Sequence, residues 1–415
     1  MKLLKPFPGL RPRKELASRV ASHPYDVVNR EEAAALAKDN PYSFFHINKP
    51  EIDVPESVDP HDPSVYQQGA ENLKRFVDEG ILIRDTEDKL YVYQQIMGEH
   101  KQVGLVAVAS VAAYEQGLIK KHEFTRPDKE DDRVNHMDAL DAQVGPVFLT
   151  YKADRTIDSL IAKVTGNSPE YDFTADDGTR HTFWVIEDLE LAADLETAFD
   201  GVQCLYVADG HHRSAAASRV CHLRQRANPQ HRGEESYNWF LTVVFPHDQM
   251  QILDYNRIVK DLGGRNPAQF LSDLEQEFTV QAVADHGVAK PDRAGQFGMY
   301  VGGQWYLLTA REVVTDSDDP VNSLDVSLLQ RQILEPMLGI GDQRTDKRID
   351  FVGGIRGLGE LQKRVDSGQW AVAFALFPTS IESLMAIADA GEVMPPKSTW
   401  FEPKLKSGLI IHVLD

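Results

Sequence analysis

The chain has 415 residues, of which 42% are hydrophobic and 26% charged, as in an ordinary globular protein. Its 44 Lys and Arg face 64 Asp and Glu, and the net charge of −20 argues against nucleic acid as a partner. The N-terminus lacks the apolar stretch of a signal peptide, and no run reaches the roughly 18 apolar residues of a membrane span. Two cysteines give no disulfide framework. We therefore expect a cytoplasmic protein without a membrane partner.

The first fifty residues are rich in loop signals. Pro6–Pro12 cannot form a helix interior or a central strand, because proline fixes φ and lacks an N–H donor. Asn29 is predicted to cap a helix that begins at Arg30, and residues 43–48 are predicted to form a strand. The polar residues here either hold turns together or contact a ligand. The candidates for ligand contact are Tyr25, Asp26 and Glu51.

Residues 66–79 are predicted to form an amphipathic helix, and residues 89–110 a β-hairpin. A charged bend follows, in which His122, Glu123 and Thr125 place a base, a carboxylate and a hydroxyl close together. Lys120, Lys121 and Arg126 form a basic cluster beside them, and such a cluster in an acidic chain favours a site here. Residues 128–133 also fit a solvated helix start. The spacing of His122 and Glu123 differs from that of a zinc protease, so it gives little support to a metal site.

Short strands and helices then alternate up to residue 199, which is typical of mixed α and β units that feed a sheet. The stretch Leu205–Ala217 follows, and we interpret it as the active site. Its apolar residues predict a buried strand, Gly210 a turn, and its alanines a helix. His211, His212 and Arg213 then lie at the N-terminus of a helix, which favours an anion such as phosphate.

The remainder predicts strands at 239–246 and 253–259, a hairpin at 296–308 and a helix at 323–338. Near the C-terminus, two prolines precede Lys397, Ser398 and Thr399, which predicts a rigid, extended presentation of these side chains. We divide the chain into an N-terminal region (1–100), a core with the central turn (101–245) and a C-terminal region (246–415) that completes the same module.

Five motifs together resemble one family, the "domain of unknown function 1015". They are Pro6–Pro12, Pro24–Val28, Lys121–Thr125, Ala208–Arg213 and Pro395–Lys404. The Asp-Gly-His-His-Arg turn is also similar to one in archaeal free-serine kinases that use ADP. Those kinases share a fold with the partition protein ParB and with sulfiredoxin. The resemblance therefore implies an α+β (mixed α/β) fold, with a ParB/sulfiredoxin-like nucleotide-binding core and additional mixed sheets.

The resemblance also implies roles for residues. Asp209, Gly210, His211, His212 and Arg213 carry over as phosphate-contacting or catalytic positions, and we add Lys397, Ser398 and Thr399 as nucleotide contacts. The kinases use a glutamate as general base. Glu123 and Glu51 are the candidates for it, and the motifs do not choose between them. The implied cofactors are ADP or ATP, with Mg²⁺ near Asp209.

The expected function is a phosphotransferase that interconverts serine and phosphoserine with a nucleotide. One alternative is a hydrolase that resembles phosphoserine phosphatase. Another is a ParB-like nucleotide-binding regulator without catalysis. A further alternative is a metal enzyme that uses His122, His211 and His212.

Overall fold

The computed structural model describes residues 1–311 and 319–414, which form two compact units. The first contains Met1–Met250 and the C-terminal residues from Pro403 onward; the second is Gln251–Glu402. Several sheets and many helices confirm a mixed α+β protein. The three-region division stays a prediction; its boundary at 245/246 lies near Met250, and its boundary at 100/101 falls within a strand.

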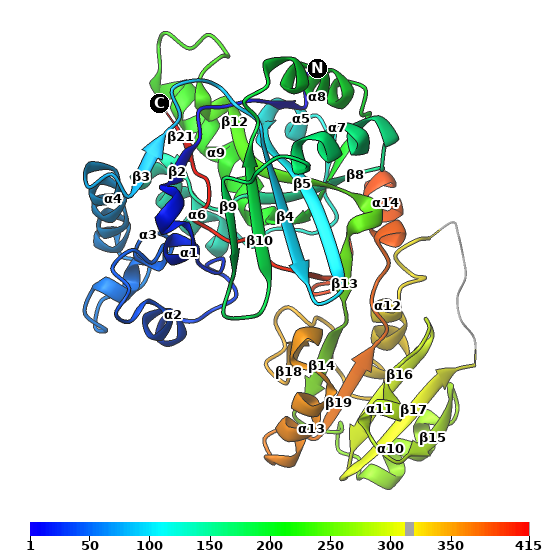
Figure 1. Ribbon diagram of the computed structural model, residues 1–415. Helices are drawn as coiled ribbons and strands as arrows, with labels where there is room; N and C mark the ends of the chain where they lie inside the picture. Colours follow the sequence, from blue (N-terminus) through cyan, green and yellow to red (C-terminus); the bar gives the residue numbers. More distant parts are fainter. Residues whose placement is uncertain (312–318, 415) are drawn as a thin grey trace. The chain divides into compact units, whose positions relative to one another are not determined.

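The first unit is built on a mixed sheet of nine described strands (Figure 1). In spatial order the path is β6 (Ile119–Lys120), β11 (Leu205–Asp209), β8 (Val147–Tyr151), β12 (Trp239–Pro246), β5 (His100–Ser110), β4 (Tyr91–Met97), β10 (Arg180–Val185) and β9 (Tyr171–Thr174). The short strand β1 (Leu4–Lys5) pairs with β5. Strand β11 runs parallel to β6 and antiparallel to β8. The segments after β6 and β11 therefore leave the sheet at the same edge.

Helices surround this sheet, and α9 (His211–Ala227) is the one that positions the site. It packs against α6 (Pro127–Leu140) and α5 (Val111–Glu115), and its buried alanines join the core cluster under the sheet. The predicted cap at Asn29 is confirmed by a capping box with Glu32 at the start of α2. The other helices of this unit are α1 (Ala17–Val20), α2 (Arg30–Ala37), α3 (Phe45–Asn48), α4 (Pro63–Asp78), α7 (Arg155–Thr165) and α8 (Leu189–Asp200).

The second unit has its own six-stranded antiparallel sheet and core. The strand order is β15 (Phe278–Val283), β17 (Gln304–Ala310), β16 (Gln296–Val301), β19 (Val372–Leu376), β14 (Tyr255–Val259) and β18 (Ile349–Gly353). A separate pair joins β13 (Gln251–Leu253) to β20 (Trp400–Glu402). The helices are α10 (Pro267–Leu274), α11 (His286–Ala289), α12 (Asp325–Leu329), α13 (Leu358–Asp366) and α14 (Ile381–Asp389). In neither described range is a helix long and apolar enough to cross a bilayer.

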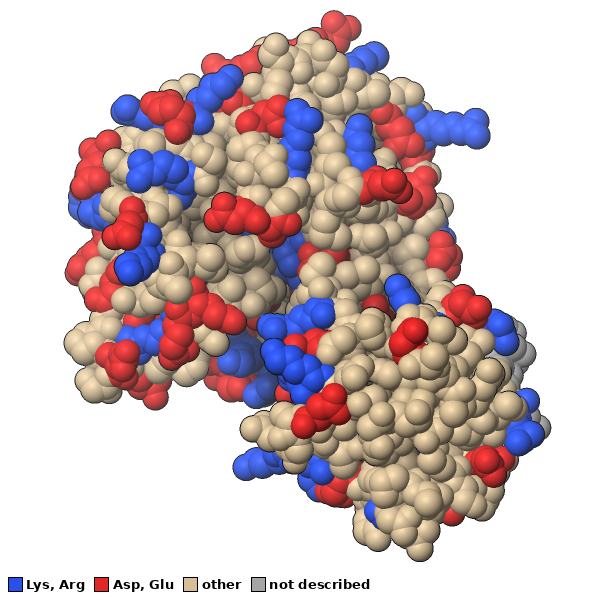
Figure 2. All heavy atoms as spheres, turned by 60° about the horizontal axis from the view of Figure 1, so that its bottom comes forward, with Lys and Arg blue, Asp and Glu red and all other residues tan. Residues whose placement is uncertain are grey.

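Charged side chains of both signs lie close together on the surface. Figure 2 shows acidic and basic side chains interspersed over the face in view. Exposed pairs such as Lys74 with Asp78 and Arg126 with Asp128 are of this kind. Local cationic sites are therefore compatible with a net charge of −20.

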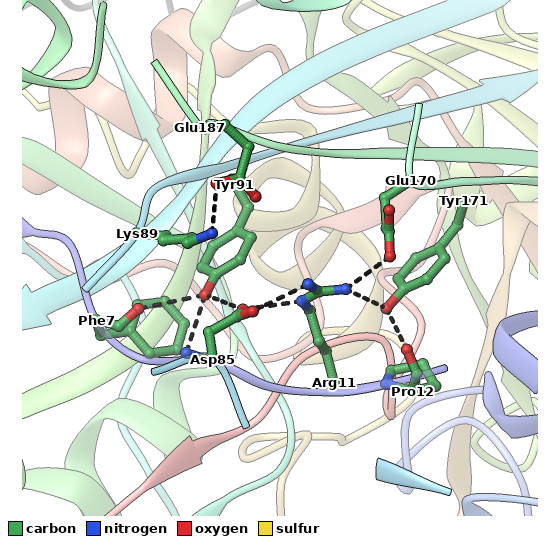
Figure 3. Close-up of polar contacts among 10 residues, drawn as sticks. Phe7, Arg11, Pro12, Asp85, Lys89, Tyr91, Glu170, Tyr171 and Glu187 are labelled. Carbon is green, nitrogen blue, oxygen red and sulfur yellow. Dashed lines mark hydrogen bonds and ion pairs between the residues drawn. The ribbon is translucent and has the colours of Figure 1, made fainter. Parts of the chain in front are cut away.

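The proline-rich N-terminal segment is held by a polar clasp (Figure 3). The guanidinium of Arg11 forms two hydrogen bonds to the Asp85 carboxylate, at 2.8 and 2.9 Å, and a third to Glu170 at 2.8 Å. The Tyr91 hydroxyl donates to Asp85 at 2.8 Å and accepts from the Gly9 amide at 2.9 Å. These polar residues therefore hold the proline-rich segment in place, which is one of the two roles expected for polar residues in this region.

Two predicted elements differ in the structure. Residues 43–48 do not form a strand; α3 covers Phe45–Asn48. Phe44 and Ile47 are both fully buried, and a helical turn puts this i, i+3 pair on one face, whereas a strand would separate them. The helix predicted at 323–338 consists of α12 followed by a π-helical turn at Gln330–Leu334. The hairpins at 89–110 and 296–308 are confirmed.

Candidate functional site

The predicted turn between a buried strand and a helix is confirmed at the junction of β11 and α9. Gly210 joins them with φ of 100°, in the left-handed region that disfavours a side chain. A Cβ at this position would lie 3.0–3.1 Å from the Arg213 guanidinium. Glycine is therefore required twice, by the backbone and by the neighbouring side chain.

Asp209 ends β11 between two cations. Lys404 Nζ lies 3.1 Å from its Oδ2, and Arg213 Nη2 lies 3.7 Å from its Oδ1. Burial raises the pKa of Asp209, but the charges of Lys404 and Arg213 outweigh burial and hold that pKa well below its usual range. The Asp209 side chain remains 28% exposed, so a dissolved ligand can reach this pair.

Arg213 is almost completely buried and rigidly held. One of its Nη atoms donates to the Pro146 carbonyl, and its side chain lies against Gly145. Its Nε is buried without a hydrogen-bond partner among the residues that the structure describes. A buried guanidinium donor without a partner is costly, and an anion at this position would satisfy it.

The first residue of α9 meets the charged bend that follows β6. The His122 and His211 ring centroids are 4.4 Å apart, with the rings nearly perpendicular at 87°. Ligand atoms of His122, Glu123 and His211 all lie within 4.8 Å of one another. Burial lowers the pKa of His122 to about 4 and holds that of His211 well below its ordinary value. Both imidazoles are therefore neutral at pH 7.

His212, the other histidine of the motif, faces the same bend. Its Nε2 accepts a hydrogen bond from the Arg126 amide at 3.1 Å. The Thr125 hydroxyl of the same bend donates to Glu130 at 2.8 Å. His212 therefore joins the bend to α9, and Thr125 joins it to α6. The sequence placed these two regions in separate clusters, and the structure brings them together.

Arg133 is a residue that the sequence interpretation missed. A solvated helix start was one interpretation of residues 128–133, but Arg133 and Asp132 are buried, at 8% and 9% exposure. The Arg133 guanidinium lies 3.8 Å from the ring centroid of Tyr25 and 2.6 Å from the Asp132 carboxylate. Burial raises the pKa of Tyr25 to about 12, and the charges of Arg133 and Arg213 oppose this. No local pattern distinguishes a buried arginine from a solvated one in such a charged run.

The other predicted residues have partners of their own. Glu51 forms an ion pair with Lys49 at 2.8 Å, and Lys49 also donates to the Tyr25 carbonyl. Lys397, Ser398 and Thr399 belong to the second unit, where the Ser398 hydroxyl donates to the Pro395 carbonyl at 2.6 Å. Their role as nucleotide contacts stays a prediction.

Comparisons with known proteins identify one family and several solved structures. The model of a family described as a protein of unknown function (DUF1015) matches residues 4–327. The search of curated proteins found no match. A free serine kinase in complex with AMP is similar at 12% identity and a TM-score of 0.35, over 73% of this chain and 92% of that chain.

Two further structures are similar to the same degree. A mutant of the free serine kinase in complex with ADP is 14% identical, with a TM-score of 0.34 over 73% of this chain and 92% of that chain. SbnI with a C-terminal truncation, from Staphylococcus aureus, is 12% identical, with a TM-score of 0.36 over 73% and 85%. These proteins are distant, so the function of this chain has to be inferred from its own side chains.

Proposed function

The chain belongs to the DUF1015 family, and we propose that it is a small-molecule phosphotransferase that interconverts serine and phosphoserine with a nucleotide. One observation carries the proposal: Lys404 and Arg213 converge on Asp209 at the N-terminus of α9, and within residues 1–311 and 319–414 the Arg213 Nε has no hydrogen-bond partner. Phosphoryl transfer requires positioning and neutralisation of spread negative charge, and this junction supplies both.

The phosphate contacts follow from the chemistry of the junction. The first N–H groups of α9, at His211 and His212, precede the first bond of the helix, in which Ser214 donates to the Gly210 carbonyl. Together with the positive end of the helix dipole they attract a phosphate. The Nε of Arg213 and the ammonium of Lys404 would add two charge-assisted hydrogen bonds.

Asp209 would act mainly as a positioning residue. Its carboxylate is ionised at neutral pH and fixes both cations in direction. Mg²⁺, which favours oxygen ligands and retains water, would be held by phosphate oxygens and by Asp209 through water, since Asp209 is already paired.

The transfer itself needs a base for the serine hydroxyl. A carboxylate would take the hydroxyl proton as the serine oxygen bonds to phosphorus and the bond to the nucleotide oxygen breaks. With ADP as donor, the products are phosphoserine and AMP. Glu123, beside His122 and His211, and Glu51, paired with Lys49, are the two candidates for this base.

The direct test incubates the purified full chain with serine and ADP or ATP, and with phosphoserine and AMP or ADP, and follows the phosphorus species by ³¹P NMR. We expect phosphoserine to form or disappear only when a nucleotide is present. Loss of phosphoserine without nucleotide would instead favour a phosphatase. Binding of nucleotide without turnover would favour a regulator. Folded protein without any turnover would contradict the proposal.

A pair of variants in the same segment makes the test specific. Lys404 and Lys406 lie two residues apart, and each forms an ion pair with an aspartate, Lys404 with Asp209 and Lys406 with Asp177 at 3.0 Å. We expect Lys404→Met to lower kcat by roughly 10²–10³-fold, as loss of a charge-stabilising donor does. Lys406→Met removes a comparable ion pair and should keep the activity per folded molecule. Equal losses would contradict a role for Lys404 in binding phosphate.

A further inference from the structure

We propose that His122, Glu123 and His211 bind one divalent transition-metal ion, with Zn²⁺ the ion that suits their donor atoms best. The site goes beyond the proposed phosphoryl transfer, which requires no ion at these three side chains. It is also distinct from Mg²⁺ on the phosphates. The third ligand is Glu123. His212 is not part of the set, because its Nε2 already accepts a hydrogen bond from the Arg126 amide.

The sheet assembles this cluster from distant parts of the chain. Strands β6 and β11 are parallel neighbours with Lys120 opposite Tyr206, so the bend after β6 and the turn after β11 leave the same edge. His122 and Glu123 come from that bend, and His211 begins α9. One ligand atom from each lies within 4.8 Å of the others, close enough for small side-chain rotations to reach a common ion.

Three buried ring nitrogens of His122 and His211 have no hydrogen-bond partner among the residues that the structure describes, which is unusual for buried polar atoms. His122 is 2% exposed, and neither of its ring nitrogens has a hydrogen-bond partner of normal geometry in the described part of the chain; the same holds for Nε2 of His211, which is 5% exposed. By contrast, His136 bonds the Ile47 carbonyl at 2.9 Å. His181 bonds the Tyr93 hydroxyl at 2.6 Å through Nδ1, although its Nε2 also has no partner among the described residues. A bound cation would give one nitrogen of each ring a partner.

The donor set determines the class of ion. Two imidazole nitrogens and one carboxylate oxygen suit Zn²⁺ and neighbouring first-row ions, whereas Mg²⁺ and Ca²⁺ prefer oxygen ligands alone. Three protein ligands leave a position for water or an anion oxygen, as in catalytic rather than structural zinc sites. Metal binding would also exclude Glu123 as the general base and leave Glu51.

The experiment measures metal content of the full chain, produced without a histidine tag and stripped with a chelator. After equilibrium dialysis against Zn²⁺, we expect about one zinc per chain, retained in excess Mg²⁺. X-ray absorption of this zinc form should give N/O ligands at about 2.0–2.1 Å with the outer-shell pattern of imidazole. This measurement needs no variant. Substoichiometric zinc, or a spectrum without imidazole, would overturn the proposal.

Variants then locate the ion. His122→Gln and Glu123→Gln should weaken zinc binding at least 10-fold. The matched control is His181→Gln, which removes an equally buried histidine from strand β10 and should keep full zinc binding. Arg213→Gln should lose phosphate binding but keep zinc binding. Failure of the proposed phosphoryl transfer can therefore be distinguished from failure of the zinc site. Equal zinc binding by His122→Gln and His181→Gln, with folding checked by circular dichroism, would overturn the assignment.

Discussion

Asp325, at the start of α12, illustrates how one carboxylate can link stability to pH. Its Oδ1 accepts from the Gly295 amide at 2.8 Å, while its Oδ2 is buried without a partner among the described residues. Burial raises its pKa to about 6, and the bond from Gly295 opposes this only in part. The ionised form is therefore disfavoured in the folded state relative to the unfolded chain.

This predicts a pH-dependent contribution with a definite sign. Because the folded pKa lies above the unfolded value, stability from Asp325 is fully present below about pH 4 and is lost as pH rises through about 6. Urea unfolding of the wild type and Asp325→Asn should differ by about 2 kcal/mol more in favour of the wild type at pH 4 than at pH 7. A difference that does not change with pH would contradict a raised pKa.

At the scale of the element, the N-terminal clasp in Figure 3 offers a comparison within one picture. The Arg11 and Asp85 side chains are only 18% and 10% exposed, whereas Glu187, which pairs with Lys89 at 2.6 Å, is 69% exposed. Removing one partner from a largely buried pair leaves the other charge without compensation.

We therefore expect Arg11→Ala to lower the free energy of unfolding by about 3 kcal/mol. Glu187→Ala should change it by less than about 0.5 kcal/mol, because exposed pairs contribute little. Denaturant midpoints at constant m-value measure both. If the two variants were equally stable, the clasp would not hold the proline-rich segment in the way described here.

The β11–α9 turn is the second element that can be tested. Gly210→Ala places a side chain at φ of 100° and close to the Arg213 guanidinium, whereas Gly178→Ala, at φ of 80°, enters open space. Both should cost about 1–2 kcal/mol through the backbone. Only Gly210→Ala should also weaken nucleotide binding, at least 10-fold, because it displaces Arg213. Calorimetric titration with ADP, alongside thermal unfolding, separates the two effects.

For the whole molecule, the division into two units predicts where a nucleotide acts. The site residues of the junction, including Lys404, all belong to the first unit. Hydrogen exchange with saturating ADP should protect residues 119–126, 205–216 and 403–406. Protection at 397–399 would add support for the predicted contacts of Lys397, Ser398 and Thr399. Protection confined to the six-stranded sheet of the second unit would contradict the proposed site.

The extent of correct prediction follows the range of the interactions. The β11–α9 turn was predictable because adjacent residues specify it: an apolar run, a glycine with positive φ and a helix-forming run. The two hairpins were predictable because each joins two strand-forming runs through a turn that contains glycine with positive φ. Residues 43–48 were wrongly predicted as a strand because a short apolar run has no unique period. The choice of helix came from burial of Phe44 and Ile47 on one face.

By itself, the sequence determined the family resemblance, the mixed α and β composition and the strand–turn–helix junction around Asp209–Arg213. Only the tertiary structure decided which side chains complete that turn. Lys404 reaches Asp209 across 195 positions, and His122 meets His211 because β6 and β11 are parallel neighbours. The physical reason is that local conformational preferences act over a few residues. Ion pairs and ring contacts between distant segments exist only once the sheet has set the strand order.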